Sequence, residues 1–190
     1  MSILTQQSEK LMLEHQAAKV FMRLYEQHFQ QPMRHIWHNQ PAKPDVSCYF
    51  AGQRLDLEIA HLYGSEAEAM HILGRTLSPQ TRLALQQLQQ VPVRQRLFTA
   101  LERLIAQKGQ KKYDSQRMWL VIRNANPAWQ GQELSAQQLN WSLPAQPPFE
   151  QIWLVKDMQG LHGLAPLYPL ALWQQVQQQL NLPPTDVAAP

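Results

Sequence analysis

The chain has 190 residues, 44% of them hydrophobic and 16% charged, with a formal net charge of +3 and a single cysteine, Cys48. This length suits one domain with a sizeable core, and a lone cysteine excludes an internal disulfide. The mild positive charge is compatible with a polyanionic partner without requiring one. No apolar run approaches the roughly 18 residues needed to span a membrane, and the N-terminus lacks a signal-peptide pattern. We therefore expect a cytoplasmic protein without a membrane partner.

The first predicted element is an amphipathic helix over residues 5 to about 30, because Leu13, Ala17 and Phe21 recur at helical spacing. Glu14 lies at the border of this apolar stripe, so its carboxylate can point toward whatever the helix covers. Glu9 is the second candidate for that position. A solvated glutamate at the helix border is the alternative interpretation, and the sequence leaves both open.

Pro32 ends this helix, and residues 33 to 43 are expected to form a loop. The loop carries His35, Trp37 and His38, but the two histidines lack the second ligand pair of a metal site. These side chains could contact nucleic acid, or Trp37 could pack under the loop.

Residues 44 to 63 are predicted to form two short strands joined by a tight turn at residues 51 to 53, around Gly52. The second strand alternates: one face carries Leu55, Leu57, Ile59 and His61, and the other carries Arg54, Asp56, Glu58 and Ala60. The apolar face is expected to lie on a core. Cys48, in the first strand, is then a small buried residue rather than a catalytic thiol.

Acidic side chains gather at one end of this hairpin. Asp45 lies at the start of the first strand, and Asp56 and Glu58 lie on the second. Carboxylates brought together repel one another unless a cation or a shared proton offsets the repulsion, and a hard divalent cation is the usual partner of such oxygen ligands. The pattern indicates a Mg²⁺ or Mn²⁺ site, although a hairpin with polar outer residues fits it as well.

A helical insertion is predicted over about residues 65 to 91. Ser65 and Glu68 have the spacing of a capping box and begin a helix that stops at Gly74. Ser78 followed by Pro79 begins another helix. The pair could cover a site as a lid or grip a substrate, and its residues identify neither role.

The next helix is predicted over residues 93 to about 112. Its buried stripe consists of leucines at helical spacing, Leu97, Leu101 and Leu104. Lys108 continues this stripe, so its ammonium either lies at the edge of the core or reaches a polar site there. Lys111 and Lys112 follow on adjoining positions. A basic helix C-terminus that complements the helix dipole is the alternative interpretation.

The rest of the chain is predicted as buried strands at 118–122 and 149–155, a turn or edge segment at 160–164 and a final helix at 169–180. Residues 124–148 are expected to form a loop with a short helix near Ser135, and residues 183–190 a disordered tail. The order of elements favours a single α/β domain over residues 1–182, a three-layer α/β/α sandwich with a central mixed β-sheet.

Pro44-Asp45, followed about ten residues later by Glu58-Ile59-Ala60 on one strand face, resembles the signature of the PD-(D/E)XK nuclease superfamily, whose fold is that of the restriction endonucleases. Asp56-Leu57-Glu58 is the alternative triplet. We prefer Glu58 as the metal-binding acid, because hydrophobic residues flank it as in many members. Ala60 then stands where the family usually has lysine. Some members carry that lysine on the following helix, and Lys108 is the matching residue here.

This resemblance, over roughly residues 9 to 156, implies metal-dependent hydrolysis of nucleic acid, with DNA expected before RNA. Asp45 and Glu58 would bind Mg²⁺ or Mn²⁺, and Asp56 would be a second ligand or a neighbour of the ligands. Lys108 would orient or deprotonate the attacking water, and Glu14 would reach the site from the first helix. The remaining residues expected to support the site, by meeting phosphates, are Lys111 and Lys112.

A second hypothesis is a non-catalytic member of the same fold that binds nucleic acid or another protein. Ala60 favours this hypothesis, because the strand lysine is missing, whereas the set of Asp45, Glu58 and Lys108 opposes it. No recognisable motif names a DNA or RNA sequence. The oligomeric state is left open, with a homodimer among the options.

Overall fold

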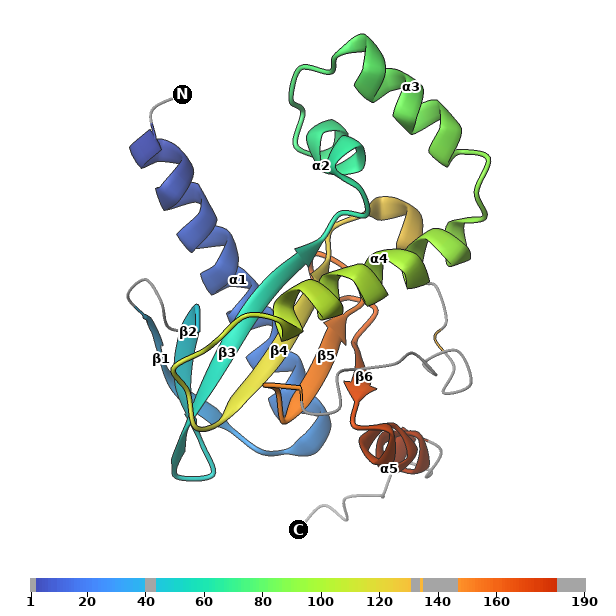
Figure 1. The fold of residues 1–190 in the computed structure, drawn as a ribbon. Helices are drawn as coiled ribbons and strands as arrows, with labels where there is room; N and C mark the ends of the chain where they lie inside the picture. The colour runs from blue at the N-terminus through green and yellow to red at the C-terminus, as the bar shows by residue number, and fades with distance from the viewer. Residues whose placement is uncertain (1–2, 40–43, 131–133, 135–146, 181–190) are drawn as a thin grey trace.

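The structure, a computed structural model, describes residues 3–39, 44–130, 134 and 147–180. In these residues a six-stranded mixed sheet is flanked by helices, which confirms the predicted α/β class and central mixed sheet (Figure 1). The elements are α1 (Ile3–Phe29), β1 (Met33–His38), β2 (Val46–Phe50), β3 (Gln53–Leu62), α2 (Glu66–Ile72), α3 (Pro79–Leu88), α4 (Val93–Gly109), β4 (Met118–Asn124), the 3₁₀ helix η1 (Pro127–Trp129), β5 (Gln151–Val155), β6 (Leu164–Tyr168) and α5 (Leu170–Leu180).

The strands lie in the sheet in their order along the chain, β1 to β6. The β1–β2, β2–β3 and β5–β6 pairs are antiparallel, and the β3–β4 and β4–β5 pairs are parallel. Ala51 and Gly52, with φ of 51° and 75°, form the two-residue turn between β2 and β3. Positive φ at both positions matches the right-handed twist of the two strands. Because β2 begins at Val46, opposite Leu57, it leaves residues 58–62 of β3 without a described strand on that side.

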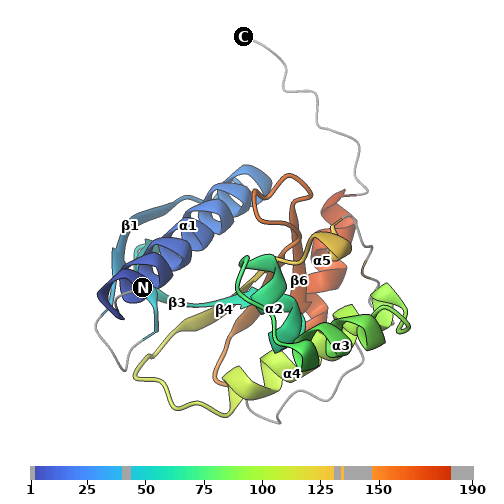
Figure 2. The same cartoon turned by 90° about the horizontal axis from the view of Figure 1, so that it is seen from above.

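Both faces of the sheet are covered. Phe21 of α1 packs with Leu57 on one face, and Leu101 of α4 packs with Leu120 on the other. Seen from above, α1 and α4 lie on opposite sides of the strands (Figure 2). The polar face of β3 is therefore buried too, so Asp56 and Glu58 are only 3% and 4% exposed.

One expectation about the strands was wrong, and the turn or edge segment expected at 160–164 leads into an edge strand that was not predicted in full. Residues 33–38 form strand β1, not a loop, and its pairing with β2 is irregular between Arg34 and Trp37, where His35 has φ 56°. This irregularity breaks the period-two pattern from which a strand is recognised. Residues 164–168 form strand β6 although they contain Pro166, because an edge strand tolerates a missing donor. The helix expected near Ser135 and the expected tail at 183–190 fall outside the described residues.

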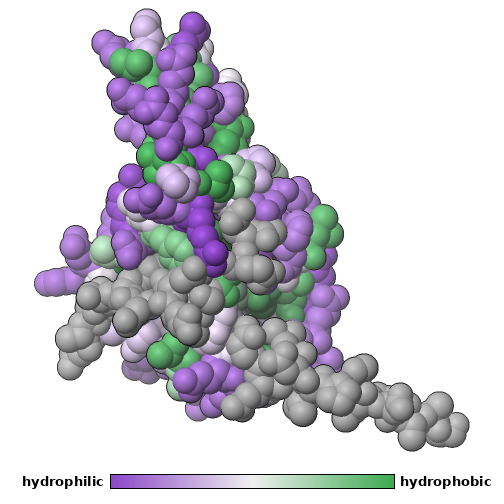
Figure 3. Space-filling view, turned by 90° about the vertical axis from the view of Figure 1, so that its right-hand side faces the viewer, coloured by the Kyte–Doolittle hydropathy of each residue, from purple (hydrophilic) through white to green (hydrophobic). Residues whose placement is uncertain are grey.

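The α2–α3 pair projects from the end of β3, and its outer surface is mostly hydrophilic (Figure 3). The predicted capping box is present, since the Ser65 hydroxyl accepts from the Glu68 amide and the Glu68 carboxylate accepts from the Ser65 amide. The same carboxylate accepts from Arg96 and Asn126, which anchors α2 to α4 and to the turn before η1. Among the described helices, none is both long and apolar enough to cross a membrane.

Candidate functional site

A cleft of about 370 Å³ opens beside the uncovered edge of β3, between the N-terminal half of α1 and the C-terminal end of α4. Four acidic and four basic side chains line it: Glu9, Glu14, Asp45 and Glu58, and Lys10, Arg75, Lys108 and Lys111. Leu73 and Arg75 reach it from the segment between α2 and α3. The cleft therefore joins residues that are up to about a hundred positions apart in the sequence.

The shortest polar contact in the cleft joins Lys108 to Glu58. The Lys108 ammonium donates to Glu58 Oε1 at 2.6 Å and to the carbonyl of Ile59 at 3.2 Å. The buried stripe of α4 fixes the rotation of the helix, and Lys108 extends from it toward β3. Its side chain is 15% exposed, so the charge is largely removed from water and is balanced by a carboxylate.

Asp45 precedes β2 and faces the same strand edge. Its Oδ2 accepts from the amide of Ile59 at 2.8 Å. Burial, and then the negative charges of Glu58 and Glu14, raise the pKa of Asp45 to about 6, against the weaker lowering effects of the Ile59 amide and Lys108. Asp45 is thus a largely buried carboxyl group with two other carboxylates close enough to act on its charge.

Glu14 enters the cleft from α1. It is 6% exposed, and Lys10, one turn earlier on the helix, lies 3.4 Å from it. The charge of Glu14 contributes to the raised pKa of Asp45, so the two carboxylates are electrostatic neighbours. Glu9, the second candidate, also lines the cleft but is exposed.

Ala60 lies between the core and the cleft. It is 5% exposed, belongs to the same core cluster as Leu97 and Leu101, and also lines the cleft. A lysine at this position would have to place part of its stem in that core. Of the other basic candidates, Lys111 lines the cleft, and Lys112 is exposed beside it without lining it.

Tyr113 is a residue that sequence reasoning missed. Its hydroxyl donates to the carbonyl of Lys108 at 3.1 Å. Burial, followed by the negative charge of Glu58, raises the pKa of Tyr113. The available signal was an aromatic residue five positions after Lys108, in a segment otherwise rich in lysine and glutamine.

Asp56 lies outside the cleft that Asp45, Glu58 and Lys108 line. Its Oδ1 accepts from the Ser47 hydroxyl at 2.5 Å and from Arg54 Nε at 2.8 Å, and its Oδ2 accepts from the Ser115 hydroxyl at 2.7 Å. Both oxygens are occupied, and Asp56 lines a different hollow, two positions along β3 from Glu58. Such neighbours on one face of a strand are about 7 Å apart. We therefore leave the expected Asp56 ligand out of the site.

The donors that remain fit a hard cation. They are the carboxylates of Asp45 and Glu58 and the carbonyl of Ile59, all oxygen. Mg²⁺ is commonly held by only one or two carboxylates, together with water and substrate phosphate. Within the described residues no group of three or more histidine, cysteine, aspartate or glutamate side chains is placed to hold a metal. This donor set suits Mg²⁺ or Mn²⁺ better than a preformed zinc site.

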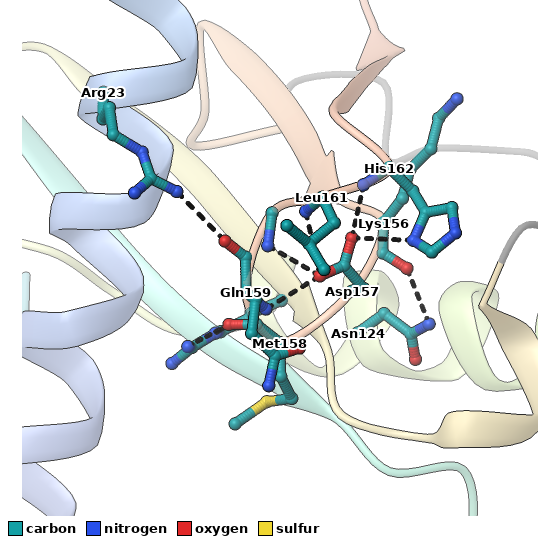
Figure 4. Close-up of polar contacts among 10 residues, drawn as sticks. Arg23, Asn124, Lys156, Asp157, Met158, Gln159, Leu161 and His162 are labelled. Atoms are coloured by element: carbon teal, nitrogen blue, oxygen red, sulfur yellow. Dashed lines mark hydrogen bonds and ion pairs between the residues drawn. The ribbon is translucent and has the colours of Figure 1, made fainter.

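Two other buried groups, Asp157 and Cys48, lie outside the cleft. Asp157, 1% exposed, accepts from the amides of residues 159–162 and from the ring of His162, which fixes the turn after β5 (Figure 4). Burial opposes its charge, but these donors together lower the pKa of Asp157. Arg23 of α1 ties the turn down through the carbonyl of Gln159. Burial raises the pKa of Cys48 to about 12, which leaves that thiol inert.

No family model, no curated protein and no solved structure matches this chain. The function must therefore be inferred from the chemistry of the cleft.

Proposed function

We propose that this protein is a metal-dependent nuclease of the PD-(D/E)XK type, with a restriction-endonuclease-like α/β/α sandwich, that hydrolyses phosphodiester bonds. The observation that carries the proposal is the meeting of Asp45, Glu58 and Lys108 beside one open strand edge. Two carboxylates and an ammonium in a cleft are the components that phosphodiester hydrolysis with a divalent ion requires.

Asp45, Glu58 and the Ile59 carbonyl would hold the ion. Burial is the first cause of the raised pKa of Asp45, and the charges of Glu58 and Glu14 add to it; a bound cation would offset the part that comes from these neighbouring carboxylates. When bound, Mg²⁺ would polarise the scissile phosphate and lower the pKa of a water molecule. Glu14, which is a neighbour of Asp45, adds negative charge behind the ligands and strengthens the attraction for the ion.

Lys108 would handle protons and charge. Its contact with Glu58 keeps the ammonium beside the ligands, where it can orient the attacking water or balance the charge that grows on the phosphate. Tyr113 holds the backbone of Lys108 through a hydrogen bond and so positions the lysine. At the rim, the exposed cations Lys10, Arg75 and Lys111 suit a polyanion such as DNA.

A second candidate function is a non-catalytic protein of the same fold that binds nucleic acid or another protein. The 2.6 Å contact between Lys108 and Glu58 favours it, because a carboxylate already neutralised by lysine attracts a metal ion less strongly. The two candidates differ in whether a divalent ion binds and supports cleavage.

The test is cleavage of mixed labelled single-stranded and duplex DNA and RNA in Mg²⁺ or Mn²⁺, with EDTA as the blank. The wild type should cleave only with the ion. Lys108→Ala should abolish cleavage at temperatures where circular dichroism shows that it is folded, since it also leaves the buried carboxylate of Glu58 without its ammonium partner. The matched control Lys112→Ala should retain cleavage. Absence of cleavage with every divalent ion, or full activity of Lys108→Ala, would favour the non-catalytic candidate.

A further inference from the structure

A group of aromatic rings lies beyond the cleft, on the same side of the sheet as Glu58. We call Trp37, Tyr49 and Arg54 the aromatic platform. The rings of Trp37 and Tyr49 are 5.5 Å apart, and the Arg54 guanidinium lies 5.8 Å from the centre of the Trp37 ring. Tyr49 and Arg54 are direct partners across the β2–β3 ladder. The three side chains thus form one continuous surface across β1, β2 and β3.

Part of this surface is open to solvent. Tyr49 is 47% exposed and Trp37 is half-buried, and among the described phenylalanine, tyrosine and tryptophan residues Tyr49 is the one that is exposed. The helix α4 crosses the upper parts of β3 to β5 and does not extend over β1 and β2, while the connection from α4 to β4 passes in front of β3 (Figure 1). Beside the platform, a hollow of about 670 Å³ is lined by Arg54, Ser115 and Arg117 among other polar residues. The platform therefore borders a space large enough for a ligand.

The platform is aligned with the candidate cleft along the strands. Asp45 precedes the ladder by one residue, on the side of β3 where Glu58 lies. Residues that lie opposite one another on neighbouring strands form a row across the sheet. The next row on that face contains Trp37 and its partner Ser47, and the row after it contains Tyr49. Successive rows on one face are about 7 Å apart. The platform therefore begins about 7 Å from the cleft and extends to about 14 Å, a span of a few nucleotides.

We propose that the aromatic platform binds unpaired bases, so that the substrate is single-stranded nucleic acid or a single-stranded end. This inference rests on the proposed nuclease function. The exposed ring of Tyr49 and the half-buried ring of Trp37 offer flat faces on which successive bases stack whatever their sequence. The bases of a duplex have both faces covered by neighbouring base pairs, so a duplex cannot use such a surface.

Arg54 supplies the charge that such a strand requires. Its Nε donates to Asp56 and its Nη2 donates to Ser47, and the side chain stays 44% exposed. In the described part of the chain its Nη1 meets no acceptor, so this nitrogen can donate to a phosphate. Acidic residues such as Asp114 and Glu150 also line the hollow. Stacking therefore provides more of the affinity than net charge, and the salt dependence of binding should be shallow.

The experiment is fluorescence anisotropy with a labelled single-stranded DNA 12-mer and a blunt duplex of the same length, in EDTA so that binding is measured without cleavage. Trp37→Ala and Tyr49→Ala should each weaken single-strand binding by roughly tenfold or more. Trp37→Phe and Tyr49→Phe keep a ring and should retain most of the affinity. Leu161→Ala, at a residue 82% exposed far from the platform in the sequence, is the control and should bind as the wild type.

Unchanged single-strand affinity in both alanine variants, or equal losses for strand and duplex, would overturn the proposal. If sedimentation shows that Trp37→Ala removes self-association while strand binding is unchanged, the surface is a protein interface and the proposal is wrong. The phenylalanine variants keep the test valid if an alanine variant fails to fold. If the nuclease proposal alone is wrong, single-strand binding will still depend on the rings of Trp37 and Tyr49, while no divalent ion will support cleavage.

Discussion

Asp56 and Glu58 are two carboxylates on the same face of the same strand, both almost completely buried, yet their surroundings differ. Asp56 is surrounded by fixed donors from three segments, Ser47, Arg54 and Ser115. Glu58 meets one flexible ammonium, from Lys108, at the wall of an open cleft. The difference follows from the ladder, because β2 runs beside Asp56 and ends before it reaches Glu58.

Burial and charge therefore do not by themselves identify a site. A carboxylate whose oxygens are all hydrogen-bonded holds the fold together, since removing it leaves several donors unsatisfied. A carboxylate with a mobile partner and a second carboxylate nearby can exchange that partner for a ligand. On this view Asp56 contributes to stability and Glu58 to function, and the two contributions can be separated by mutation.

The largest expected effect is on cleavage. Glu58→Ala should reduce metal-dependent cleavage to the level of the EDTA blank, because one of the two proposed carboxylate ligands is lost. Asp56→Asn, which keeps the size of the side chain, should retain cleavage at temperatures where it stays folded. Rates measured under single-turnover conditions decide this, and equal losses in both variants would erase the distinction between the two acids.

The second expected effect is on stability, where the loss of Asp56 should cost more than the loss of Glu58 together with its partner Lys108. Asp56→Ala should lower the free energy of unfolding by about 2 kcal/mol, because it leaves the buried hydroxyl of Ser47 and the Nε of Arg54 without an acceptor, whereas Ser115 can still donate to the Arg117 carbonyl. Glu58 is compared in the double variant Glu58→Ala/Lys108→Met, which removes the buried ammonium together with its partner and should cost less than Asp56→Ala. Urea unfolding measures both variants, and a larger loss in the double variant would contradict the assignment of Asp56 as the structural acid.

The third prediction concerns Asp45 and the dependence of stability on pH. Its pKa is about 6 in the folded protein against 3.8 for an ordinary aspartate. Between these values the folded state binds more protons than the unfolded state, so stability falls as pH rises. Because Asp45 is partly exposed, we expect a loss of about 1 to 2 kcal/mol from pH 4 to pH 7.

Asp45→Asn should remove this part of the pH profile, as measured by urea unfolding in EDTA. Mg²⁺ should offset the loss above pH 6, where the carboxylate is ionised and able to bind a cation. A wild-type profile identical to that of Asp45→Asn would show that folding does not raise the pKa of Asp45.

The smallest expected effect is that of Glu14, on α1, on the binding of a divalent ion. Glu14→Gln should weaken divalent-ion binding by about tenfold, the lower end of the range for residues that support metal ligands. Glu9→Gln is a matched control on the same helix, and its exposed side chain should matter little. Titration calorimetry distinguishes the two, and equal affinities in both variants would exclude Glu14 from the site.

Local patterns were enough to predict part of this arrangement. The leucine period of α4 correctly aims Lys108 toward the sheet, because helix rotation depends only on nearby residues. The alternation in β3 likewise separates Glu58 from Ile59. The capping box of α2 is read from Ser65 and Glu68 alone.

The rest depended on contacts that the sequence does not display. Ser115, 59 positions from Asp56, satisfies that carboxylate and removes it from the expected ligand set. Tyr113 reaches Lys108 only because the chain turns back after α4. Because β1 is irregular, the sequence around Trp37 does not show a strand pattern. The contact between the rings of Trp37 and Tyr49 could therefore not be predicted.

The most direct measurement is isothermal titration of the metal-free protein with Mn²⁺ and Mg²⁺, for the wild type, Glu58→Ala and Asp56→Asn. The account predicts saturable binding to the wild type and to Asp56→Asn, and none to Glu58→Ala. Binding that survives in Glu58→Ala and disappears in Asp56→Asn, or absence of binding to the wild type, would contradict the claim that the cleft between α1 and α4 is a metal site.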